Sequence, residues 1–335
     1  MGVPAPHKYE KVEWLSAQRV LVFALFSAVL AFSAQDFFKK ANEFYDAGKY
    51  REAIPMYLAA IKHDQLEPYA WFNLGNTYVH LEANNRAMFA YKRAAELAPN
   101  FAKPWVLLGD ISYSYGSYGQ AMVYYRRAEE LGEKSEHLSY AMASAYLNLK
   151  AYVLAERYFE QALNENPDKL EAWLGLAECA RQTGDFELAV EVLQKALQKS
   201  VNVSPDLYYT LSYYYLQQDS LKAAIRSMEN GLYLDSKNYN ARRYLAGLYE
   251  NANSPWMAIW TLEQGIATGS GVRELEMDLA EIYFKQKRLG EALTHYQKAL
   301  RAGSAAARTG IENVGNAFYN LGDTLQAESA YRMLR

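Results

Sequence analysis

A 34-residue period runs through most of this 335-residue chain and limits the folds open to it more than any other feature. Within each period, apolar residues recur at helical spacings, so each copy offers two amphipathic helices. A helix pair of this size cannot bury its apolar face alone, and neighbouring copies must therefore stack on one another. The period predicts an all-α repeat protein with one continuous core.

Nine copies follow one another in phase. Their expected starts lie near residues 34, 68, 102, 136, 170, 205, 239, 273 and 308, with the sixth and ninth one residue late. The ninth copy is incomplete because the sequence ends within its second expected helix. We therefore expect one elongated domain over residues 34–335, in which the first helix of each copy packs against the second.

The copy that begins at Pro68 shows the pattern most clearly. It carries Trp71, Leu74, Gly75, Tyr78, Ala87, Tyr91, Ala94 and Pro99. This pattern resembles the signature of the tetratricopeptide repeat family, and the resemblance covers about 300 residues of the chain. It implies a right-handed solenoid of antiparallel helix pairs. Small residues such as Gly75 and Ala87 would let the two helices approach closely, and large residues would fill the space around that contact.

Glycines mark the expected turns inside the copies. Gly48, Gly184 and Gly322 each stand where the first helix of a copy should end, and glycine supplies the positive φ of such an end. Pro55 lies one turn into the second helix of the first copy. There it should remove a hydrogen bond and bend the helix.

Residues 1–33 differ from the rest of the chain. Lys8, Lys11 and Arg19 precede an uncharged apolar run from Val20 to Phe32. Small residues stand at the end of this run and directly after it, at Ala31, Ser33 and Ala34. A basic segment, a short apolar run and a small-residue site are typical of a secretory signal peptide. The run is shorter than the roughly 20 residues that span a bilayer. We expect an exported protein, periplasmic or secreted, cut before Ala34. The alternative is a membrane anchor formed by residues 20–34.

Composition excludes several classes of function. The formal net charge is −3 and no block of Lys or Arg occurs, so the basic surface of a nucleic-acid binder is missing. The one cysteine, Cys179, excludes an internal disulfide, and its apolar neighbours predict a buried, inert thiol. The five histidines lack ligand spacing, and there is no phosphate-binding glycine loop and no G-x-S-x-G. We expect no enzyme activity, no metal and no cofactor.

The family resemblance implies a binding surface. In that family, ligands lie in a concave groove lined by positions 2, 5, 6, 9, 12 and 13 of each first helix. Transferred to this chain, the strongest candidates are Phe38, Asn42, Tyr69, Phe72, Asn73, Asn76, Lys103, Tyr113, Tyr140, Tyr209 and Tyr213. The same positions include Tyr45, Asp110, His137, Glu178, Arg243, Glu281 and Asn316. Many of these residues are aromatic, and such side chains offer rigid area with a polar tip.

One sub-type of the family grips C-terminal carboxylates of cytosolic chaperones. Asn42, Asn73 and Lys103 match its motif, but Phe38 and Leu107 stand where it has Lys and Arg. Without both cations the grip on a carboxylate is weak. This ligand is therefore disfavoured.

The sequence favours an exported bacterial scaffold that binds a peptide or protein partner in its concave groove. Glycan binding, in support of polysaccharide assembly or secretion, is an alternative because aromatic and amide side chains also suit sugars. A third reading is the substrate-docking region of a larger enzyme. The sequence does not name the partner, the pathway or the oligomeric state.

Overall fold

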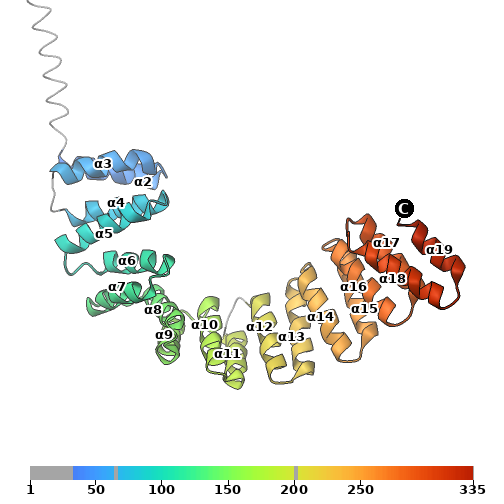
Figure 1. Ribbon diagram of the computed structural model, residues 1–335. Helices are drawn as coiled ribbons and strands as arrows, with labels where there is room; N and C mark the ends of the chain where they lie inside the picture. The colour runs from blue at the N-terminus through green and yellow to red at the C-terminus, as the bar shows by residue number, and fades with distance from the viewer. Residues whose placement is uncertain (1–32, 64–66, 200–202, 335) are drawn as a thin grey trace, which may run out of the picture. The chain divides into compact units, whose positions relative to one another are not determined.

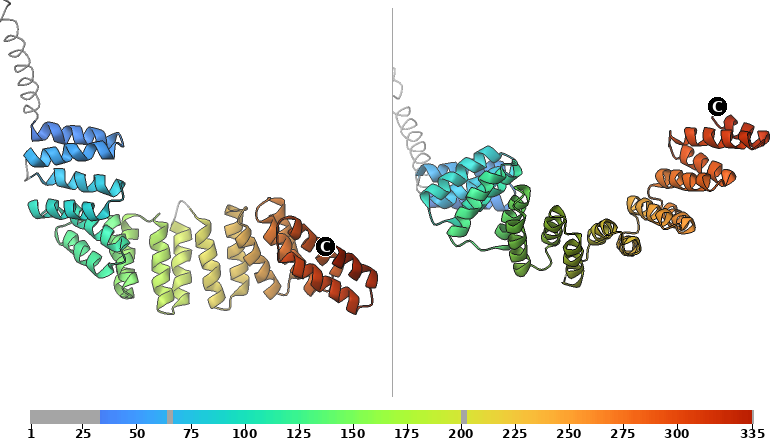
Figure 2. Two further views of the ribbon diagram at one scale, coloured as in Figure 1. Left: turned by 45° about the horizontal axis from the view of Figure 1, so that its top comes forward. Right: turned by 60° about the horizontal axis from the view of Figure 1, so that its bottom comes forward.

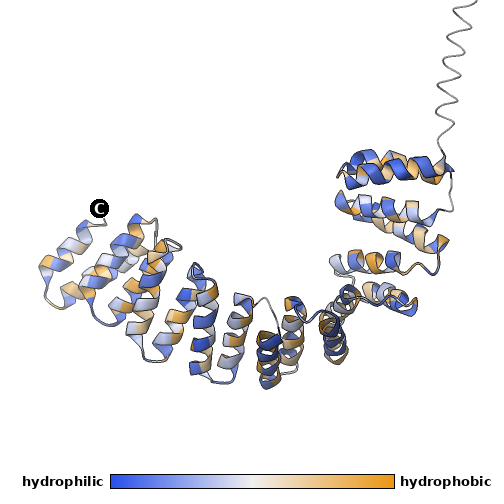
Figure 3. Cartoon of the chain, turned by 180° about the vertical axis from the view of Figure 1, so that it is seen from behind, coloured by the Kyte–Doolittle hydropathy of each residue, from blue (hydrophilic) through white to orange (hydrophobic). Residues whose placement is uncertain are grey.

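The computed structural model describes residues 33–63, 67–199 and 203–334. Within these ranges the chain forms eighteen α-helices and no strand. Hydropathy alternates around the helices, which present one apolar and one polar side (Figure 3). The all-α repeat architecture expected from the sequence is confirmed. The expected signal peptide, residues 1–33, lies outside the described chain except for Ser33.

The described residues separate into two compact units, of which the first ends at Ala151 and the second begins at Tyr152. The first unit holds seven described helices, stacked in chain order in Figure 1. They are α2 (Ala34–Asp46), α3 (Tyr50–His63), α4 (Pro68–His80), α5 (Asn84–Leu97), α6 (Ala102–Ser114), α7 (Tyr118–Glu130) and α8 (Glu136–Asn148).

The second unit holds the remaining eleven described helices. They are α9 (Tyr152–Glu165), α10 (Leu170–Gln182), α11 (Phe186–Lys199), α12 (Pro205–Gln217), α13 (Leu221–Leu234), α14 (Tyr239–Asn251), α15 (Pro255–Ala267), α16 (Val272–Lys285), α17 (Leu289–Arg301), α18 (Ala307–Asn320) and α19 (Thr324–Arg332). Successive helices within this unit run antiparallel, as the two views of Figure 2 show. None of the helices in the described ranges is long and apolar enough to cross a membrane.

Helix ends follow from local sequence. The side chain of Ser33 accepts a hydrogen bond from the backbone N–H of Asp36, and the Asp36 carboxylate accepts one from the N–H of Ser33. This reciprocal arrangement satisfies N–H groups that α2 leaves without intrahelical partners. Helix α3 continues through Pro55 as a single element.

The turn between the two helices of each repeat places one residue in the left-handed region. Gly48, Gly184 and Gly322 have φ of 71°, 81° and 83°, as the sequence predicts. Five repeats use a residue with a side chain at the same place, among them Glu82 with φ of 56° and Asp219 with φ of 55°. Because a Cβ atom is disfavoured there, these turns carry local strain.

Small residues allow the two helices of a repeat to approach closely. A Cβ atom built on Gly75 would lie 2.5 Å from the Tyr91 ring, and one on Gly109 would lie 2.3 Å from the Tyr125 ring. Both rings are almost fully buried, as is Ala87. The packing role that the sequence assigns to these positions is confirmed. Cys179 is also buried, as expected.

Candidate partner-binding surface

The surface of interest is the first-helix face, which we define as the side chains at positions 2, 5, 6, 9, 12 and 13 of the first helix of each repeat. In the first unit, hydrogen bonds join this face across neighbouring first helices. Asn73 Nδ2 donates to Asn42 Oδ1 at 3.0 Å between α4 and α2, and Asn148 Nδ2 donates to Tyr113 Oη at 3.0 Å between α8 and α6. The face therefore continues from α2 to α4 and from α6 to α8, the first helices of neighbouring repeats.

Two histidines take part in the same kind of contact. The Tyr45 hydroxyl lies 3.0 Å from Nε2 of His80, whose ring stacks on Tyr50 at 4.2 Å between centroids. Asp110 Oδ2 lies 2.9 Å from Nε2 of His137. Each contact links adjacent repeats.

A recurring pair of residues fixes the polar groups at position 9. In four repeats, a tyrosine hydroxyl from the second helix donates to the Asn or Asp fifteen residues earlier. The pairs are Tyr57–Asn42 (2.6 Å), Tyr91–Asn76 (2.7 Å), Tyr125–Asp110 (2.9 Å) and Tyr331–Asn316 (2.7 Å). The hydroxyl acts from beneath the face, so the amide or carboxylate is held in one orientation.

Burial makes these tyrosines reliable donors. The rings of Tyr57, Tyr91 and Tyr125 are at most 1% exposed. Burial is the largest cause that raises the pKa of each hydroxyl, which therefore keeps its proton over the whole neutral range. These residues lie beneath the face and are not contact residues for a ligand.

Sequence reasoning assigned Asn42 and Asn76 to the ligand and Tyr91 to the repeat pattern, without joining them. The sequence nevertheless contains a pattern that indicates this pairing. Tyrosine occupies position 24 where position 9 is Asn or Asp, whereas Phe159 accompanies Ser144 and Leu262 accompanies Gly247. The fifteen-residue spacing between two polar-tipped side chains could have revealed the pair.

Aromatic rings cluster on the face in the first unit, where Tyr69 is exposed and Phe72 is half-buried. Tyr69 is 56% exposed, and its ring lies 5.2 Å from that of Phe101. Phe72 lies 5.0 Å from the same ring and 5.8 Å from Tyr91. Phe101, the residue just before α6, lies outside the six face positions and was missed for that reason. Such ring clusters bury apolar area at low entropic cost.

A cavity opens at the start of the face in the first unit. It has a volume of about 650 Å³, and the candidate residues Phe38, Tyr69 and Asn73 are among those that line it. Three of the candidates thus share one hollow. Pockets of this size lined by rings and a few polar groups are typical of binding sites.

The remaining candidates differ in exposure. Lys103 and Tyr213 are exposed, whereas Tyr113 and Tyr140 are half-buried. Tyr209 packs its ring over Gly231 of α13, and its hydroxyl oxygen is buried. Tyr209 therefore offers a ligand much less surface than Tyr69 does.

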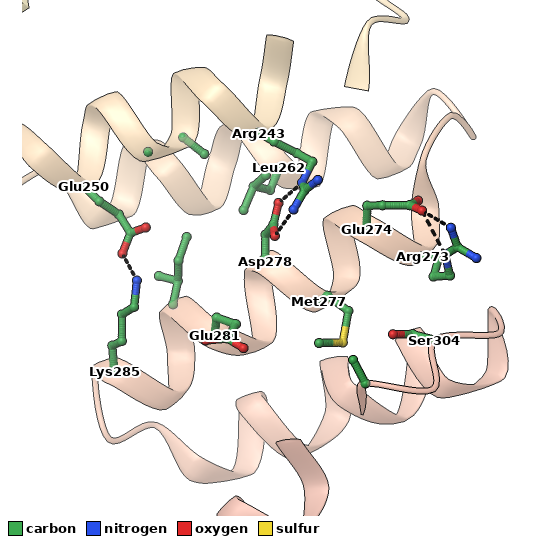
Figure 4. Close-up of a pocket in the computed structure, with 14 residues that line it drawn as sticks. Arg243, Glu250, Leu262, Arg273, Glu274, Met277, Asp278, Glu281, Lys285 and Ser304 are labelled. Carbon is green, nitrogen blue, oxygen red and sulfur yellow. Dashed lines mark hydrogen bonds and ion pairs between the residues drawn. The ribbon is translucent and has the colours of Figure 1, made fainter. Parts of the chain in front are cut away.

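In the second unit a hollow between α14 and α16 is lined by many charged side chains (Figure 4). Arg243 donates to both carboxylate oxygens of Asp278, at 2.5 and 3.0 Å. Lys285 Nζ donates to Glu250 Oε1 at 3.1 Å. Both pairs join residues thirty-five apart and so cross from one repeat to the next. A cavity of about 550 Å³ lies among them.

Two observations on the described residues concern metal ligands and the one thiol. No group of three or more His, Cys, Asp or Glu side chains within the described ranges could hold a metal ion. Burial raises the pKa of the Cys179 thiol to about 12, so the thiol is not a nucleophile at neutral pH.

The fold and its periodic contacts define a helical repeat protein built from stacked helix pairs. Three family models described as tetratricopeptide repeat match residues 38–102 and 258–307, 150–211, and 205–238, which together make up more than half of the sequence. The chain belongs to the tetratricopeptide repeat family.

Known relatives are similar over most of this chain. The BBSome complex member BBS4 of Bos taurus is 23% identical over 292 residues, which cover 87% of this chain and 56% of that protein. The anaphase-promoting complex subunit CDC16 of Saccharomyces cerevisiae is 22% identical over 314 residues, which cover 87% of this chain and 36% of that protein. The chain thus spans about half or less of the length of these relatives.

A solved structure supports the fold alone. The C-terminal part of a tetratricopeptide repeat protein from Cytophaga hutchinsonii superposes with a TM-score of 0.60 at 14% identity. The match covers 71% of this chain and 98% of that structure.

Proposed function

We propose that this protein is a non-enzymatic scaffold that binds a segment of a partner protein on its first-helix face. The observation that carries the proposal is the combination, in the first unit, of the exposed Tyr69 ring and half-buried rings near it with amide groups held in place from below. Tyr69 supplies area and a hydrogen-bonding tip, while Asn42 and Asn76 keep fixed orientations. Preorganised polar groups beside rigid rings reduce the entropy lost on binding.

Two further facts support binding to proteins. Both relatives named above are, by their names, members of multiprotein complexes. Tetratricopeptide repeat proteins generally act as interaction scaffolds. A partner segment that lies along several repeats would use the concave side that this fold provides in the family.

The N-terminal sequence supports a location outside the cytoplasm. Its basic segment, apolar run and small-residue site suit export, so we propose that the scaffold meets its partner in the periplasm or outside a bacterial cell. Detection of a mature chain that begins at Ala34 in a periplasmic fraction tests this part separately. An intact N-terminus in a membrane fraction would favour the anchor instead.

Capture of partners from the native compartment tests the binding surface. A variant with Tyr69, Phe72 and Tyr113 changed to Ala should lose its partners while its helical circular dichroism stays unchanged. The matched control changes Phe89 and Val123 to Ala. Both are 59% exposed and lie on the second helices α5 and α7. If the first variant keeps every partner, or the control loses them, the surface is assigned wrongly.

Glycan binding is the second candidate, and the exposed ring of Tyr69 beside amide side chains is the observation that favours it. Titration of the protein with oligosaccharides separates the two candidates. A response that the Tyr69 variant loses would favour a glycan, and no response would leave the protein partner.

A further inference from the structure

The charged cavity over α14 and α16 differs from the aromatic face of the first unit. Seven charged residues are among those that line it: Arg243, Glu250, Arg273, Glu274, Asp278, Glu281 and Lys285. Their formal charges sum to −1 because three are cations and four are anions. Figure 4 shows them arranged around the hollow. The cavity therefore carries one negative charge in excess.

The three cations already have carboxylate partners. Arg243 forms a bidentate ion pair with Asp278, and the Asp278 side chain is only 26% exposed. Lys285 pairs with Glu250, and Arg273 Nε donates to Glu274 at 2.8 Å. An acidic ligand would have to displace one of these internal carboxylates. The pairs thus select against acidic segments.

Glu281 is the lining carboxylate that belongs to none of the ion pairs within the described chain. It occupies position 9 of its repeat, the place where Asn42, Asn76 and Asp110 stand in the first unit. The buried Tyr296 lies beneath it. Burial and the charge of Glu281 raise the pKa of Tyr296 to about 12. Glu281 is exposed on the face and carries the unbalanced charge.

Room for a ligand exists in the hollow that Glu281 lines. Gly247 occupies position 9 of α14, and a Cβ atom built on it would meet no heavy atom within 4 Å. Three repeats of the first unit carry an Asn or Asp side chain at this position, whereas the repeat that contains α14 leaves open space there. The half-buried Met277 also lines the hollow and adds apolar surface.

We propose that a lysine or arginine side chain of a basic partner segment enters this hollow over Gly247 and pairs with Glu281. The long aliphatic stem of such a side chain would pack on Met277 while its charge reaches the carboxylate. The proposal rests on the proposed function, since it names the chemistry of a segment bound on the first-helix face. It assigns the second unit a specificity for basic segments.

Direct titration tests the cation site. The probe is N-acetyl-arginine methylamide, followed by NMR of the full chain, with the norleucine and glutamate analogues as comparisons. We expect shifts near Gly247 and Glu281 with the arginine probe, weaker binding as salt rises, and no binding of the glutamate analogue. Equal responses to arginine and norleucine, or no response to arginine, would overturn the proposal.

Two substitutions sharpen the test. Glu281→Gln should weaken arginine binding about tenfold, because it removes the charge and keeps the shape. Glu312→Gln, at an exposed acid on α18, is the matched control and should leave binding unchanged. Gly247→Lys should abolish binding by placing an internal cation in the hollow, whereas Gly247→Ala should keep most of it. If Glu281→Gln and Glu312→Gln behave alike, the site is assigned wrongly.

The outcome is separable from the proposed function. If arginine fails to bind while the Tyr69, Phe72 and Tyr113 variant still loses its partners, the scaffold function stands and the cation site falls. If that variant keeps its partners while arginine binds at Glu281, the cation site stands without the aromatic surface.

Discussion

The Tyr91 hydroxyl donates a hydrogen bond of 2.7 Å to Oδ1 of Asn76, from the second helix of the repeat to the first. The ring of Tyr91 lies over Gly75, one residue before Asn76. One side chain therefore packs the two helices together and also orients the Asn76 amide on the surface. The same arrangement recurs at Tyr125, Gly109 and Asp110. It explains part of the abundance of tyrosine, which supplies 29 residues of the sequence.

Removal of this hydroxyl tests its contribution. Tyr91→Phe keeps the ring but leaves the Asn76 amide without its donor, and we expect a loss of about 1 kcal/mol in the free energy of unfolding. Urea denaturation followed by circular dichroism measures it. Tyr233→Phe is the control, because Tyr233 is 87% exposed and its hydroxyl should contribute nothing. Equal effects of the two substitutions would contradict the role of the pair.

Two helical glycines should respond oppositely to alanine. Gly75→Ala places a Cβ atom 2.5 Å from the buried Tyr91 ring, so overpacking should outweigh the gain in helix propensity, with a net loss of about 1–2 kcal/mol. Gly247→Ala meets nothing within 4 Å and should gain about 1 kcal/mol. Thermal unfolding of both variants measures these two changes in stability. A gain from Gly75→Ala would show that the packing is looser than described.

The left-handed turns offer a stabilising substitution. Glu82 has φ of 56° and an exposed side chain, so Glu82→Gly should relieve strain and raise the free energy of unfolding by about 0.5–1 kcal/mol. Gly116→Ala, at φ of 70° in the equivalent turn, should lower it by a similar amount. Denaturant midpoints of both variants measure the change. Effects of the same sign would rule out backbone strain as the cause.

Alkaline pH should unfold the protein through its buried tyrosines. Burial is the largest cause that raises the pKa of Tyr214 and Tyr296 to about 12, against about 10 in the unfolded chain. The folded state therefore holds protons that the unfolded state loses. This stability is fully present below pH 10 and is lost as pH rises towards 12.

Phenolate absorbance and circular dichroism should show this coupling. We expect part of the tyrosine absorbance change to coincide with loss of helix above pH 10, whereas in denaturant all tyrosines should titrate together. Complete titration with the helices intact would contradict the burial of these hydroxyls.

The sequence predicted the fold in detail because the repeat signature encodes it locally. Gly48 and Gly322 stand at their turns, Gly75 and Ala87 lie at helix contacts, and the helix starts at Pro68 and Ala102 coincide with the periodic positions. Each of these features depends on residues within one repeat or its neighbour. Periodicity is therefore sufficient to place them.

The surface could be predicted only in part. Periodicity placed Tyr69 and Asn73 on the first-helix face, but not the ring of Phe101, which lies outside the numbered positions. Side-chain pairing also depends on reach and competition between partners. Arg243 bonds Asp278 thirty-five residues away, a choice that spacing alone does not decide among several nearby acids.

Site-specific photocrosslinking tests the central claim, that partners bind on the first-helix face. A photoreactive phenylalanine derivative is placed at position 69 or at position 89, where the native side chains are 56% and 59% exposed on first and second helices. In the native compartment, we expect partner crosslinks from position 69 and none from position 89. Crosslinks from position 89 alone, or equal yields from both, would contradict the account.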